Sequence, residues 1–194
     1  MGTTISIVSL QAPKEARKQY EKAVGLYPRY AAAWSGLGVA LERLNDTAGA
    51  RNAYTQASTS DPNYVSPHVQ LAGLAAKAEN WPELLDTTNH ALKLDPQNYP
   101  AAYLYNAVAQ LNLGNIDDAE RSAREGLKLD TEHRFPKINR LLGAILAEKR
   151  DFPAAIGYMR SYLQSAPQAS DAEIVRKQLA EVERLAQASP AVAP

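Results

Sequence analysis

The feature of this sequence that most constrains its fold is a regular spacing of prolines. Pro28, Pro62 and Pro96 follow one another at intervals of 34 residues. Other residues keep the same interval, and we call each set of positions related in this way a register. Three such pairs are Ala16 and Ala50, Tyr20 and Tyr54, and Ala23 and Ala57. A fixed period of this length predicts an array of stacked helical units.

The registers continue beyond Pro96 with a small drift. One register contains, in order, Trp34, His68, Tyr103 and Asn139. Another is occupied by the small residues Gly38, Ala72, Ala107 and Gly143. A small residue in a helix lets a second helix approach closely, so this register predicts tight helix pairs.

Local signals place the boundaries of the units. Apolar residues recur at helical spacing inside each unit, Asn80 with Glu83 is a typical helix start, and Gly114 is placed to end a helix with positive φ. We expect a β-like or disordered segment over 1–12 and a half unit over 13–28. Four full units are expected to follow, over 31–62, 65–96, 100–131 and 136–167. We expect a capping helix over 170–187, opened by a capping box at Ser170, and then a disordered tail over 188–194.

Composition excludes several classes of function. Lys plus Arg and Asp plus Glu both number 21, so the formal net charge is zero, which gives no electrostatic reason to expect nucleic acid or an anionic membrane as a partner. The chain has no cysteine, which excludes disulfides and thiolate metal sites. Because no apolar run approaches ~18 residues, we expect no membrane span.

The sequence offers no set of residues suited to catalysis. The histidines, His68, His90 and His133, fall in different units with no second metal ligand at helical spacing. His68 shares a register with Trp34, which predicts a packed ring rather than a ligand. Nothing places a serine beside a base. We therefore expect no enzyme activity, no cofactor and no metal.

These registers resemble the tetratricopeptide repeat (TPR) family. The family pattern is matched by Trp34, Leu37, Gly38 and Leu41, then by Ala50, Tyr54, Ala57 and Pro62. The resemblance covers about residues 13–167 and implies an all-α fold, a right-handed superhelical stack of helix-turn-helix units with a capping helix. The chain departs from the pattern at Asn106, Thr131 and Tyr162. Asn106 stands where leucine is usual and needs a hydrogen-bond partner if it is buried.

The start of the chain resembles a different junction. Residues 4–10 are rich in β-branched side chains and predict a strand. With the helix signals that follow, they resemble bacterial TPR proteins that carry an N-terminal β-sandwich domain. That resemblance implies a periplasmic or cell-envelope location; without it we expect a cytoplasmic one. The half unit over 13–28 lacks a preceding first helix, so residues 1–27 are also a candidate homodimer contact.

The resemblance also implies where a partner binds. In TPR arrays the first helices of successive units line a concave groove, and by register the candidate partner-binding residues are Arg43, Val69, Lys77, Leu104, Tyr105, Val108, Asn112, Lys137 and Arg140. This set suits a peptide with an apolar centre and an acidic end. We therefore expect a non-catalytic protein-interaction scaffold; the alternative is a self-association or spacer module of a larger bacterial envelope protein.

Overall fold

The computed structural model describes the backbone of residues 2–188 and the side chains of residues 11–188. This part of the chain contains ten α-helices and no strand, so the predicted all-α fold class is confirmed. The chain divides into two compact units, residues 1–96 and residues 97–194. None of the described helices is long and apolar enough to cross a membrane. The tail predicted over 188–194 lies, from residue 189 on, outside the described residues.

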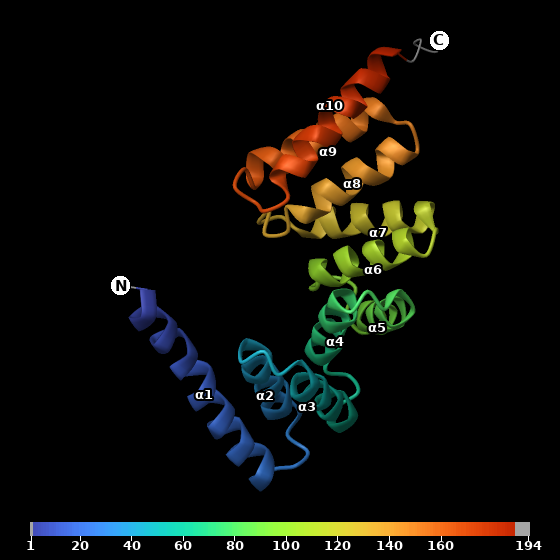
Figure 1. Cartoon of the computed structure of the whole chain (residues 1–194). Helices are drawn as coiled ribbons and strands as arrows, with labels where there is room; N and C mark the ends of the chain where they lie inside the picture. The colour runs from blue at the N-terminus through green and yellow to red at the C-terminus, as the bar shows by residue number, and fades with distance from the viewer. Residues whose placement is uncertain (1, 189–194) are drawn as a thin grey trace. The chain divides into compact units, whose positions relative to one another are not determined.

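The first unit holds five helices that follow one another along the chain (Figure 1). They are α1 (Gly2–Leu26), α2 (Ala31–Arg43), α3 (Thr47–Ser60), α4 (Val65–Lys77) and α5 (Trp81–Leu94). Each packs against the next in sequence, with α2 paired to α3 and α4 paired to α5. The core centres on a cluster that includes Val24, Leu37, Leu41, Tyr54 and Leu74.

The second unit continues the same alternation. Its helices are α6 (Pro100–Asn112), α7 (Ile116–Leu129), α8 (Lys137–Glu148), α9 (Phe152–Ser165) and α10 (Ala172–Ala188). The first helices α6 and α8 also contact each other, and α10 packs against α9. Asn106 is buried here, and its Oδ1 accepts a hydrogen bond from Ser122 Oγ at 2.7 Å. The side chain therefore has the hydrogen-bond partner that a buried asparagine needs.

All four helix pairs are joined by the same turn. At the turn between α6 and α7, the N–H of Gly114 donates to the carbonyl of Leu111 at 3.0 Å, and the N–H of Asn115 donates to that of Gln110 at 2.9 Å. These two bonds form a Schellman motif, which places one residue in the left-handed region. The residues in that position are Asn45, Glu79, Gly114 and Arg150, with φ of 62°, 53°, 82° and 62°.

Small residues bring the paired helices together, as the sequence predicted. A Cβ added at Gly38 on α2 would lie 2.4 Å from Cε1 of Tyr54 on α3. A Cβ at Gly143 on α8 would lie 2.6 Å from Cγ of Met159 on α9. Both distances are too short for any real contact, so the pairing depends on the missing methyl group.

The prediction of a strand over residues 4–10 is wrong, because α1 is one helix from Gly2 to Leu26. A strand needs a neighbouring strand for its backbone hydrogen bonds, and the described part of the chain contains none. A helix satisfies those bonds within the segment, and β-branched residues lower helix propensity only slightly. Pro13 therefore lies inside α1 rather than at its start. The capping helix likewise begins at Ala172, so Asp171, not Ser170, precedes it directly.

Candidate partner-binding surfaces

The predicted groove residues fall into two groups, one in each unit. Arg43 lies on α2, and Val69 and Lys77 lie on α4 of the first unit. The second unit holds the remaining six, which are Leu104, Tyr105, Val108 and Asn112 on α6 and Lys137 and Arg140 on α8. The two groups are therefore described as separate surfaces.

In the first unit, Lys77 is held by an internal ion pair. Its Nζ pairs with Oε1 of Glu42 on α2, and Oε2 of Glu42 accepts a hydrogen bond from the hydroxyl of Tyr54 at 3.1 Å. Burial of the ring, aided by the nearby Glu42 carboxylate, raises the pKa of Tyr54, so the hydroxyl stays protonated and donates. Glu42 thus joins α2, α3 and α4, and it already balances the charge of Lys77.

Arg43 lies beside a cavity that the sequence did not predict. A cavity of about 340 Å³ opens between α1 and α2, and Arg43 is exposed at its edge. The cavity is lined by Ala12, Pro13, Ala16, Tyr20, Gly36, Val39, Ala40 and Arg43. It depends on α1 continuing as a helix past Pro13, whereas the sequence predicted a change of structure there. Val69 is half-buried on α4.

The apolar centre of the second unit lies on α6. Leu104 packs against the core cluster of this unit while remaining partly exposed, and Tyr105 and Val108 are also half-buried. Asn112 is exposed and its Nδ2 donates to the carbonyl of Val108 on its own helix at 2.8 Å. The face of α6 therefore offers mainly apolar contact to a ligand.

The basic residues at the start of α8 differ in their surroundings. Nη1 of Arg140 lies 3.1 Å from Oδ2 of Asp171, while Oδ1 of Asp171 accepts a hydrogen bond from the buried hydroxyl of Tyr162. The Tyr162 bond, followed by the charges of Arg140 and Lys137, lowers the pKa of Asp171, and burial together with that bond raises the pKa of Tyr162 to about 12. Lys137 is exposed and forms no ion pair within residues 11–188.

A second cavity lies between α8, α9 and the capping helix α10. It has a volume of about 420 Å³ and is lined by Ala144, Ala147, Met159, Lys177, Gln178, Glu181 and Val182. The sequence predicted α10 only as a capping helix, so its contribution to this surface was not expected.

Two of the three histidines, His68 and His90, form a structural contact. The rings of His68 on α4 and His90 on α5 lie with their centroids 4.4 Å apart. His68 Nε2 lies 3.4 Å from the carbonyl of Pro62, as Trp34 Nε1 donates to that of Pro28 at 2.8 Å. His68 is therefore a packed ring, as its register predicted. No group of three or more metal-ligating side chains occurs in the described part of the chain.

Comparison with known proteins agrees with this architecture. The family model described as "Tetratricopeptide repeat" matches residues 9–65 and 104–170, more than half of the chain. No curated protein matches the sequence. The similar solved structures compared with this chain are at most 23% identical to it and show the fold alone.

Three solved structures illustrate the likeness. PilF of Pseudomonas aeruginosa has a TM-score of 0.77 and 18% identity, covering 93% of this chain and 81% of that chain. YrrB, "a TPR protein with an unusual peptide-binding site", has a TM-score of 0.71 and 16% identity, covering 87% and 86%. The APC/C hetero-tetramer Cut9–Hcn1 has a TM-score of 0.72 and 19% identity; the match covers 88% of this chain but only 33% of that one. By its repeats, its helix pairs and the family model, this chain belongs to the tetratricopeptide repeat family.

Proposed function

We propose that this chain is a non-catalytic scaffold that binds a partner protein through the faces of its first helices. We further propose that α6 and α8 take an extended peptide with an apolar centre and an acidic end. Membership of the TPR family supports the scaffold role. The peptide-binding site named for YrrB, which shares this fold, supports the choice of ligand.

The observation that carries the proposal is the exposed, unpaired Lys137 beside the apolar face of α6. Lys77 and Arg140 are each balanced by a carboxylate of their own unit, whereas Lys137 has no such partner among the described residues. Since α6 and α8 contact each other, Leu104 and Val108 lie on the helix next to it. An acidic residue of a ligand would supply the missing partner for Lys137.

The experiment uses a peptide with the chemistry of the proposed ligand. Fluorescence anisotropy is measured with a labelled extended peptide that has leucine and valine in its centre and aspartates at one end. A second peptide carries lysines in place of the aspartates. We expect the acidic peptide to bind and Lys137→Glu to weaken its binding roughly tenfold, the effect of replacing an exposed attraction by a repulsion.

The matched control is Lys128→Glu, which makes the same charge change at an exposed position of the second helix α7. It should leave the affinity unchanged. Val108→Glu should also weaken binding, because it places a charge on the apolar face. Equal affinity for the acidic and basic peptides, or equal effects of Lys137→Glu and Lys128→Glu, would overturn the proposal.

A further inference from the structure

The cavity between α8, α9 and α10 has a floor of apolar side chains. Met159 of α9 and Val182 of α10 are buried, with only 3% and 6% of their surface exposed, and Ala144 and Ala147 of α8 also line the cavity. The Met159 side chain lies close against α8, because a Cβ added at Gly143 would be 2.6 Å from its Cγ. The cavity volume of about 420 Å³ is within the range of pockets that hold a ligand.

The cavity borders the face of α8 that carries the basic residues. Along α8, one side of the helix is formed by residues at steps of three, four and three, which are Lys137, Arg140, Ala144 and Ala147. Arg140 pairs with Asp171 just before α10, so the start of α10 lies beside this face. The same face of α8 therefore leads from Lys137 to the cavity.

The polar rim of the cavity leaves Lys177 without a carboxylate partner in the described part of the chain. The other charged residue of the rim, Glu181, is balanced on its own helix, with Oε1 2.6 Å from Nη2 of Arg184. Lys177 is exposed and forms no ion pair among residues 11–188. The uncompensated charge at the rim is positive, so it favours an acidic or uncharged ligand segment over a basic one.

We propose that this cavity anchors one large apolar side chain of the ligand, such as leucine. The inference rests on the peptide site proposed for α6 and α8, and it adds α10 to that site. Ala144 has on α8 the register that Val108 has on α6, 36 residues earlier. The occupant of the cavity is therefore the same extended peptide, whose apolar centre covers Val108 and whose leucine enters the cavity beside Ala144.

Distances along α8 determine where this side chain stands in the peptide. Ala144 and Ala147 follow Lys137 by seven and ten residues, and since a helix rises about 1.5 Å per residue, the cavity lies about 10–15 Å along α8. An extended peptide covers about 3.3–3.6 Å per residue, so the leucine is expected about three or four residues from the acidic residue that meets Lys137. The residues between them pass Arg140, which needs no charged partner because Asp171 already balances it.

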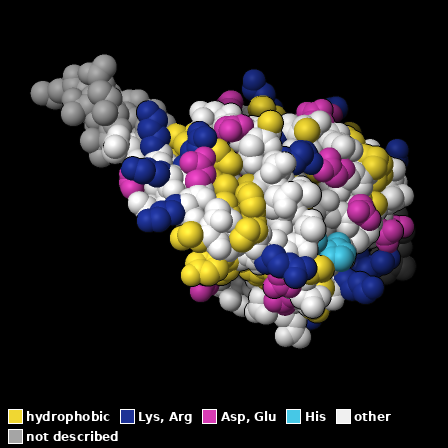
Figure 2. All heavy atoms as spheres, turned by 90° about the horizontal axis from the view of Figure 1, so that it is seen from below, with side chains coloured by type: hydrophobic (Ala, Val, Ile, Leu, Met, Phe, Trp, Pro, Cys, Tyr) yellow, Lys and Arg dark blue, Asp and Glu magenta, His cyan; other side chains and the backbone are white. Residues whose placement is uncertain are grey.

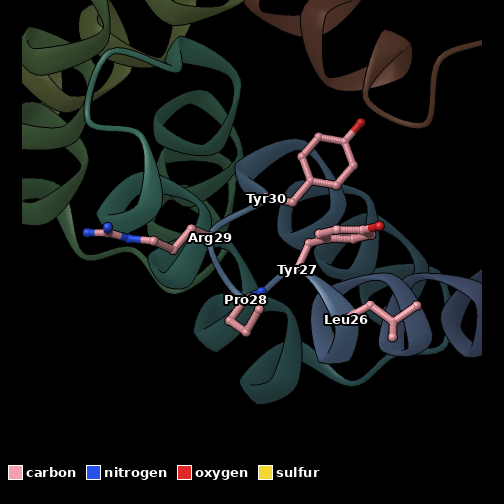
Figure 3. A pocket seen from close by; sticks show the side chains of 5 residues that line it. All are labelled: Leu26, Tyr27, Pro28, Arg29 and Tyr30. Atoms are coloured by element: carbon pink, nitrogen blue, oxygen red, sulfur yellow. The ribbon is translucent and has the colours of Figure 1, made fainter.

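Exposure of apolar side chains alone does not mark a ligand site in this protein. Hydrophobic side chains lie among charged ones in the view of Figure 2, as is normal for a protein surface. A larger cavity, of about 590 Å³, lies at the end of α1, but all five residues that line it are exposed. Figure 3 shows the rings of Tyr27 and Tyr30 on the same side of this turn and Arg29 on the other. Because it has no buried floor, this cavity serves as the competing site in the test.

Fluorescence anisotropy with labelled peptides and the full chain tests the proposal. Each peptide has the acidic end and the valine of the proposed ligand and a single leucine, which is moved one residue at a time away from the nearest aspartate. The series is made in both chain directions. We expect the tightest binding, in one direction, with the leucine about three or four residues away, and at least about tenfold weaker binding with glycine there, the effect of not burying one leucine side chain.

Three variants separate the two cavities. Ala144→Phe fills the cavity beside α8 and should remove the preference for leucine over glycine; Ala147→Phe replaces it if circular dichroism shows that it is unfolded. The matched control, Gly157→Phe, adds the same ring at an exposed position of α9 where a Cβ meets nothing within 4 Å. It should keep the preference, and so should Tyr27→Ala, which alters the cavity at the end of α1.

Equal affinity at every leucine position, or tightest binding at another spacing, would overturn the inference. So would a preference for leucine that survives filling of the cavity beside α8 and disappears in Tyr27→Ala. Failure of the proposed function is a different result, in which Lys137→Glu leaves the affinity for the acidic peptide unchanged. If Lys137→Glu weakens binding and the leucine position has no effect, the peptide site stands and only the anchor in the cavity is wrong.

Discussion

Replacing Gly38 by alanine tests whether the close approach of paired helices stabilises the fold. The added Cβ would lie 2.4, 2.5 and 2.9 Å from three ring atoms of Tyr54. The ring is fully buried, and its neighbours Ala50, Ala53 and Ala57 are buried on the same helix. A flexible side chain could swing aside, but this ring is rigid and enclosed, so α2 and α3 must separate.

The magnitude follows from three contributions. Alanine is favoured over glycine in a helix interior by about 1 kcal/mol. Overpacking of an enclosed site costs about 1–3 kcal/mol. Moving the ring also strains its hydrogen bond to the Glu42 carboxylate, and such bonds to charged groups contribute about 1.5–3 kcal/mol. We therefore expect Gly38→Ala to lower the free energy of unfolding of the first unit by roughly 1–3 kcal/mol.

The assay uses the placement of the tryptophans. Both of them, Trp34 and Trp81, lie in the first unit, so tryptophan fluorescence during urea unfolding reports on that unit while circular dichroism reports on the whole chain. The matched control is Gly157→Ala on α9, where an added Cβ meets nothing within 4 Å. It should stabilise by up to about 1 kcal/mol without moving the fluorescence transition. A Gly38→Ala chain as stable as the original would refute the reasoning.

Three further perturbations have expected outcomes. Arg150→Gly should stabilise the second unit by about 0.5–1 kcal/mol in urea unfolding, because Arg150 has φ of 62° in the turn after α8; a loss of stability would contradict this. Tyr162→Phe removes the donor to Asp171 and should cost about 1.5–3 kcal/mol by circular dichroism, with a raised Asp171 pKa by NMR; unchanged stability would count against the bond. Burial and the nearby His90 lower the pKa of His68, so the stability it contributes is complete above the unfolded pKa of about 6.5 and is lost as pH falls below it. His68→Gln should remove that part of the pH dependence of fluorescence-monitored unfolding, and an unaltered profile would contradict the assignment.

Much of the fold could be predicted because its determinants are local or periodic. The register of Gly38 and Gly143 predicted close helix approach, and both glycines face a side chain of the paired helix. Gly114 has the predicted positive φ, and Asn80 accepts a hydrogen bond from the N–H of Glu83. These features depend on a few neighbouring residues, so the sequence carries them directly.

The start of the chain was predicted wrongly because its local signal was ambiguous. Residues 4–10 have the composition of a strand, yet they continue α1. Secondary-structure preference is a weak term, and the presence or absence of a neighbouring strand outweighs it. The sequence alone does not show whether such a neighbour exists.

The candidate site likewise separates what the repeat register predicts from what only the tertiary structure shows. Register by itself determined on which helix, and at which repeated position, Lys77, Lys137 and Arg140 stand. Only the tertiary structure decided that Glu42 balances Lys77, that Asp171 pairs with Arg140, and that Lys137 has no such partner among the described residues. The physical reason is that a repeat fixes the position of a side chain, whereas its exposure and net charge depend on residues brought beside it from elsewhere in the chain. The same reason separates Tyr54 from Tyr20, which share a register but differ in what covers them.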